Sequence, residues 1–64
     1  MCLSTIYIDS KGQRHKVMQD VAGIEAQKDG YALIDLFGVR KFVQGKIKAV
    51  DFIDEHIVVL EDNK

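Results

Sequence analysis

The amino-acid sequence predicts a small all-β protein, built as a sandwich or a barrel. Short runs rich in β-branched and aromatic residues alternate with turn-forming residues at close spacing, which is typical of these folds. No stretch keeps the period of a helix long enough to predict one, and none of the 64 residues is proline. A chain of this length predicts one domain, residues 1–64.

The first half of the chain predicts four strands separated by turns. Ser10-Lys11-Gly12 forms the first turn, because its glycine adopts a positive φ without strain. Gln19-Asp20 is predicted to end the second strand, and Gly23 to form a bulge or bend within the third. Asp29-Gly30 is the clearest hairpin signal, since this dipeptide suits a twisted two-residue turn. The strands are expected at Thr5–Ile8, Arg14–Met18, Val21–Gln27 and Tyr31–Leu36.

The second half predicts two or three more strands. Val39–Gln44 follows the break at Phe37-Gly38 and is closed by Gly45. A further strand covers the apolar residues between Ile47 and Ile53, and a turn at Asp54-Glu55 precedes the last strand, Ile57–Leu60. Both faces of that last strand are apolar, so we expect it to be central in the sheet or covered by a partner chain.

The core of so short a chain is thin. A domain of about 60 residues buries only about 60% of the surface that its unfolded chain exposes. Such domains usually need disulfides, a metal or a partner for stability. The single cysteine excludes an internal disulfide, so the sequence predicts either a bound metal or self-association.

Composition argues against several classes of partner. The formal net charge of −1 gives no general attraction to nucleic acids or anionic membranes. The longest apolar run, Ile57–Leu60, is far shorter than the ~18 residues that a membrane span needs. The N-terminus has neither the basic nor the apolar region of a signal peptide. Together with the free cysteine, these features predict a cytoplasmic protein.

We predict no catalytic activity. His15 and His56 belong to no Ser-His-Asp spacing, the chain has no phosphate-binding glycine loop, and a domain this small has little room for a pocket. A small RNA-binding barrel is the alternative to metal binding. It would use aromatic side chains beside a basic cluster of four residues: Arg40, Lys41, Lys46 and Lys48.

The most distinctive chemistry lies at Met1-Cys2, where the only cysteine adjoins the α-amine. A lone cysteine is often an inert buried thiol, but a side chain at position 2 has little chain before it to bury it. Its thiolate, with the α-amine or the deprotonated Cys2 amide, would chelate Ni(II) or Cu(II), which accept square-planar nitrogen–sulfur sets. A structural zinc site needs four close ligands, which Cys2 and two distant histidines do not supply. Four ligands from two-ligand chains require two chains, so the site also predicts a dimer.

Four segments of the chain together resemble a known family. They are the opening Met1–Ser4, the stretch Asp35–Gly38, the residues Ile47 and Val50–Phe52, and the segment Ile57–Glu61. Their arrangement is similar to that of CooT, a family of small nickel-binding accessory proteins linked to maturation of carbon monoxide dehydrogenase. The resemblance spans nearly the whole chain, and the Met-Cys opening is its most specific part.

The resemblance implies an SH3-like β-barrel of six or seven short antiparallel strands, paired as a homodimer. One Ni(II) would lie at the subunit interface, held by Cys2 of both chains through sulfur and backbone nitrogen. Met1 would contribute its α-amine if that is the nitrogen ligand. No family histidine carries over onto His15 or His56. The client would be carbon monoxide dehydrogenase or another nickel enzyme.

Overall fold

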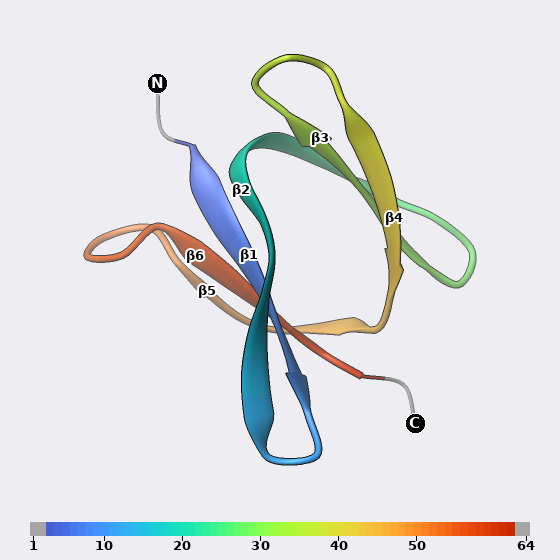
Figure 1. The fold of residues 1–64 in the computed structure, drawn as a ribbon, viewed down its shortest axis with the longest axis vertical. Coiled ribbons are helices and arrows are strands. Elements are labelled where there is room, and N and C mark those ends of the chain that lie inside the picture. Colours follow the sequence, from blue (N-terminus) through green and yellow to red (C-terminus); the bar gives the residue numbers. More distant parts are fainter. Residues whose placement is uncertain (1–2, 63–64) are drawn as a thin grey trace.

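The computed structural model describes residues 3–62, which form six β-strands (Figure 1). No residue in this range is helical, so the predicted all-β class is confirmed, and no helix there is long and apolar enough to cross a membrane. The strands are β1 (Ser4–Ser10), β2 (Gln13–Ala26), β3 (Gly30–Asp35), β4 (Arg40–Gln44), β5 (Lys46–Asp51) and β6 (Ile57–Glu61).

The six strands form one mixed sheet in the order β4-β3-β2-β1-β6-β5. β1 and β6 run parallel, whereas the other neighbouring strands are antiparallel. The sheet curls (Figure 1), but its two end strands, β4 and β5, do not pair with each other within the described residues. The predicted closed barrel of antiparallel strands is therefore wrong in both respects. Only Gly45 separates β4 from β5, and a one-residue connection is too short to fold β5 back along β4 as a hairpin.

β2 is the longest strand and pairs with two neighbours in turn. Its first half pairs with β1 as far as Val21, and its second half pairs with β3 as far as Ala26. The strand bends at Asp20, whose φ is +55°. Gln19-Asp20 thus bends one 14-residue strand and does not end it, contrary to the prediction. The irregularity predicted near Gly23 is confirmed, because the register with β3 shifts between Val21 and Gly23.

Two predicted glycine turns have different outcomes. Lys11 and Gly12 have φ values of +52° and +79° and form the turn between β1 and β2, as predicted. Gly30 is instead the first residue of β3, so the turn falls at residues 28–29, closed by a bond of 2.8 Å from Gln27 N to Gly30 O. Glycine is required at position 30 for space, since a Cβ there would lie 2.1 Å from the Val43 carbonyl oxygen.

The core is small and lies inside the curl of the sheet. Ile6 of β1, Leu33 of β3 and Leu60 of β6 are fully buried, and Val21 and Val58 pack with them. β6 lies between β1 and β5, which is the central position that its two apolar faces allowed. Large hydrophobic side chains remain exposed in the described chain, in keeping with a thin core: Leu36, Phe37, Val39, Phe42, Ile47, Val50, Phe52 and Ile53.

Candidate functional site

The predicted metal ligands Met1 and Cys2 lie outside the described residues. The structure therefore locates the place where their segment enters the sheet, which is the start of β1. Here Ser4 pairs with β2 and Thr5 pairs with β6. The amide of Thr5 also donates a hydrogen bond of 3.1 Å to the carbonyl of His56, just before β6.

Two loops lie at this same end of the sheet, on opposite sides of β1 (Figure 1). The β3–β4 loop, residues 36–39, follows Asp35 two strands away on one side. The β5–β6 loop, residues 52–56, follows Asp51 two strands away on the other. We call these two loops and the start of β1 the N-terminal rim.

An aspartate builds each loop of the N-terminal rim. Asp35 Oδ1 accepts hydrogen bonds from the amides two and four residues later, at 2.9 and 2.8 Å. Asp51 Oδ1 accepts bonds from the amides of Ile53 and Asp54, at 2.9 and 3.0 Å. The bonds from Asp54 and Ile53 lower the pKa of Asp51, because they favour the ionised carboxylate. Both loops are thus held in defined turns.

The most exposed large apolar side chains of residues 3–62 lie in these loops. Ile53 is 87% exposed, Phe37 83% and Phe52 70%, and Leu36 and Val39 are about half exposed. Side chains this exposed add little to folding. Their gathering at one end of the sheet indicates a surface for binding.

An apolar groove of about 460 Å³ opens beside the N-terminal rim. Ser4 lines it at the start of β1, and Phe52 lines it from the β5–β6 loop. The exposed apolar surface of the N-terminal rim is therefore continuous with the groove through Phe52. The other lining residues come from β2, β3, β5 and β6: Ala22, Gly23, Ile24, Ala26, Tyr31, Ile47, Val50 and Val58.

The structure separates the two histidines. His15 lies on β2 opposite Ile8, toward the hairpin end of β1. His56 lies on the N-terminal rim, with a φ of +54°. Residues 3–62 contain no group of three or more His, Cys, Asp or Glu side chains that could hold a metal. That neither histidine is a nickel ligand stays a prediction.

The predicted basic cluster is divided between two strands. Arg40 and Lys41 lie on β4, and Lys46 and Lys48 lie on β5, at opposite ends of the strand order. Arg40 forms an ion pair with Glu25, Lys48 pairs with Asp9, and Lys46 lies in register with Glu61. Two of the four cations are thus neutralised by carboxylates of their own chain, which weakens the electrostatic attraction that the RNA-binding alternative needs.

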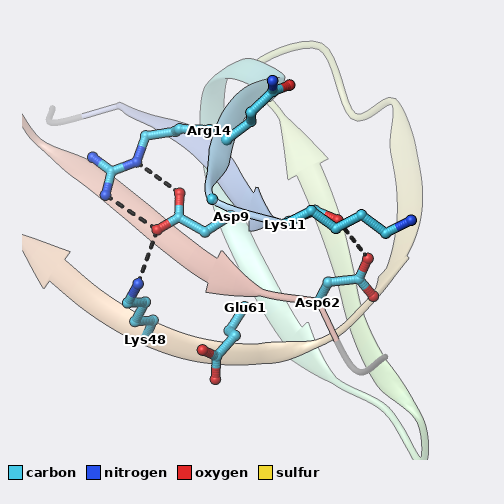
Figure 2. A pocket seen from close by; sticks show the side chains of 9 residues that line it. Asp9, Lys11, Arg14, Lys48, Glu61 and Asp62 are labelled. Carbon is cyan, nitrogen blue, oxygen red and sulfur yellow. Dashed lines mark hydrogen bonds and ion pairs between the residues drawn. The ribbon is translucent and has the colours of Figure 1, made fainter.

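A polar hollow of about 650 Å³ lies beside the β1–β2 hairpin, with Asp9 at its centre (Figure 2). Arg14 Nε donates to Asp9 Oδ1 at 2.8 Å, and Lys48 Nζ donates to Oδ2 at 3.0 Å. The Arg14 and Lys48 hydrogen bonds lower the pKa of Asp9 to about 2. The three side chains come from β1, β2 and β5, so they tie the sheet together across β6.

Asp9 should make the fold sensitive to acid. The pKa of aspartate in an unfolded chain is about 3.9, and the folded value is lower, about 2. The stabilisation is therefore present above about pH 4 and lost as the pH falls to about 2. We expect Asp9→Asn to lower the thermal midpoint at neutral pH and to flatten its fall across this range. If the thermal midpoints of wild type and variant differed by the same amount at every pH, this role of Asp9 would be contradicted.

Comparison with known proteins connects this architecture to one family. The profile of the family described as CO dehydrogenase accessory protein CooT matches residues 1–61. The chain belongs to the CooT family. The fold is also similar to the crystal structure of a candidate CooT from Carboxydothermus hydrogenoformans, with a TM-score of 0.87 and 25% sequence identity, over 98% of this chain and 100% of that chain. Among curated proteins, none matches the chain significantly. The resemblance seen in the sequence is thereby confirmed.

CooT membership assigns the chain to accessory proteins, which assist an enzyme. Sequence reasoning found the Met-Cys opening of this CooT chain but missed the N-terminal rim. The signal was present twice, as an aspartate followed by two large apolar residues, in Asp35-Leu36-Phe37 and in Asp51-Phe52-Ile53. In each case the carboxylate accepts the amide of the second apolar residue, which turns the chain and exposes the pair.

Proposed function

We propose that this CooT protein is a nickel-binding accessory protein that holds one Ni(II) between two copies of the chain. The ligands are the Cys2 thiolates of both copies, each with a backbone nitrogen of its own N-terminus. That nitrogen is the α-amine of Met1 or the amide of Cys2. The nickel is cargo, passed to carbon monoxide dehydrogenase during its maturation in the cytoplasm.

One observation carries the proposal. The CooT match starts at residue 1 and so includes Met1 and the only cysteine, Cys2. A thiolate beside a backbone nitrogen is a bidentate nitrogen–sulfur donor, and two such donors complete the square plane that Ni(II) prefers. The same residues lack the four close ligands of a structural zinc site.

The place where β1 begins supports a site shared by two copies. Only Leu3 separates residues 1 and 2 from Ser4, where β1 begins, so the proposed ligands directly precede the N-terminal rim in the sequence. The exposed apolar side chains of the N-terminal rim offer a second copy a surface to cover.

Nickel titration at several pH values tests this function. We expect one Ni(II) per two chains in native mass spectrometry, with sulfur-to-nickel charge-transfer absorption. Each bound thiolate displaces a proton, because the ordinary thiol pKa is about 8.5. The two thiolates alone should therefore weaken the affinity about 100-fold for each pH unit below about 8, and the two nitrogen ligands, which must also lose a proton, should make the dependence steeper. One nickel per chain, or an affinity independent of pH, would contradict the shared thiolate site.

A further inference from the structure

We infer that the two copies meet rim to rim, with the β5–β6 loop of each copy packed against the β3–β4 loop of the other. This inference rests on the proposed function, in which two N-termini share one nickel. It adds the surface that brings them together and the direction of the symmetry axis.

The positions of the two loops suit such an exchange. Both lie at the end of the sheet where β1 begins, each two strands from β1, on opposite sides. A two-fold axis perpendicular to the plane of Figure 1, beside the first residues of β1, therefore carries each loop toward the position of the other. The resulting interface is isologous, as in most soluble dimers.

The charges of the two loops are complementary. The β5–β6 loop contains Asp54 and Glu55, both exposed. The β3–β4 loop runs directly into Arg40 and Lys41, also exposed. Arg40 forms an ion pair with Glu25 within its own chain. Lys41 takes part in no ion pair among residues 3–62, so it is the cation best placed to face a second copy.

These charges favour one of two possible orientations of the two-fold axis. An axis lying in the plane of the sheet would place each loop against its own copy, and Asp54 and Glu55 would meet the same carboxylates of the partner. The perpendicular axis places them against Lys41 instead. Opposite charges facing across an interface fix its orientation, whereas facing like charges disfavours it.

The apolar side chains match in the same arrangement. Phe52 and Ile53 on one copy would cover Phe37 and Val39 on the other, and symmetry repeats the contact. Each of these side chains is at least half exposed in the single chain, from 56% for Val39 to 87% for Ile53. Covering them removes apolar surface from water, including that of Phe52, which lines the apolar groove. The axis passes beside the start of β1 in both copies, which brings the first described residues of the two chains toward each other.

Charge reversal tests this interface on the metal-free full chain. Sedimentation velocity should show that Lys41→Glu and Glu55→Lys each raise the dimer dissociation constant about tenfold or more, since symmetry makes two repulsive contacts in each variant. The double variant, Lys41→Glu with Glu55→Lys, should recover dimerisation close to that of the wild type. Lys28→Glu, in the exposed β2–β3 turn away from the N-terminal rim, is the matched control and should leave the constant unchanged.

The apolar contact is tested by Ile53→Ser. The side chain is almost fully exposed, so its loss should leave the fold intact by circular dichroism while the dimer dissociates. The matched control is Phe42→Ser, an exposed aromatic residue on β4 outside the N-terminal rim, which should stay dimeric.

The outcomes separate this inference from the proposed function. The loop pairing is overturned if the single charge variants dimerise like the wild type, or if the double variant dimerises no more tightly than the single variants. Nickel uptake through Cys2 is then still tested separately by Cys2→Ser. Nickel retained by Cys2→Ser overturns the function even if the charge variants behave as expected. A wild-type chain that stays monomeric with nickel bound overturns both the pairing and the shared site.

Discussion

Replacing Cys2 with serine is expected to abolish nickel uptake and to leave the protein folded and dimeric. A serine hydroxyl keeps its proton at neutral pH and is a poor ligand for Ni(II), whereas the cysteine thiolate is a strong one. The loss should exceed the 10- to 100-fold that removal of an outer-shell partner costs, and the sulfur-to-nickel absorption should vanish. The fold should persist because the sheet begins at Ser4 and the buried core lies within the strands.

Two further sets of variants complete this experiment, read by absorption and native mass spectrometry. His15→Ala and His56→Ala should bind nickel like the wild type, since neither histidine is a proposed ligand. A tag on the N-terminus should disturb the site if the α-amine is the nitrogen ligand, and should matter less if the Cys2 amide is. Full nickel binding by Cys2→Ser, or loss of nickel binding in either histidine variant, would show that Cys2 is not the residue that holds the metal.

Local patterns predicted the strands well and their closure poorly. The Lys11-Gly12 turn and the apolar β6 were found because each depends on residues adjacent in sequence. The bend at Asp20 was mistaken for a strand end, since a residue with positive φ looks the same in sequence whether pairing resumes after it or not. The parallel pairing of β1 with β6 joins residues such as Thr5 and Ile57, and no local signal predicts a contact so distant in the chain.

The candidate site also has one part that local sequence predicts and one part that it does not. The chemistry of Cys2 follows from residue type and position alone, so the sequence sufficed to single it out. The N-terminal rim requires the topology, because Phe37 and Ile53 come to the same end of the sheet only through the strand order. The ion pairs of the basic cluster needed the topology too, since Arg40 and Lys48 are close in sequence but pair with carboxylates on different strands.

Replacing Gly30 with alanine is expected to cause a large loss of stability for the addition of a single methyl group. The added Cβ would lie 2.1 Å from the carbonyl oxygen of Val43 and 2.9 Å from Cα of Gln44. These are backbone atoms of β4, so the clash is relieved only if β3 and β4 separate. Overpacking usually costs about 1–3 kcal/mol, and we expect about 3 kcal/mol here, at the upper end. A chain of 64 residues has only about 3–10 kcal/mol in total, so the variant should lose at least about a third of its free energy of unfolding.

Gly23→Ala provides the matched control for this prediction. Gly23 lies on the neighbouring strand β2, and a Cβ there would meet Ile34 Cδ1 at 3.6 Å, an ordinary contact with a side chain. Its free energy of unfolding should stay within about 1 kcal/mol of the wild type, since the alanine also restricts the unfolded chain. Urea denaturation at one fixed protein concentration compares the three proteins, because dimer stability depends on concentration. Similar midpoints for Gly30→Ala and Gly23→Ala would show that β4 does not lie as close to Gly30 as the register of β3 and β4 requires.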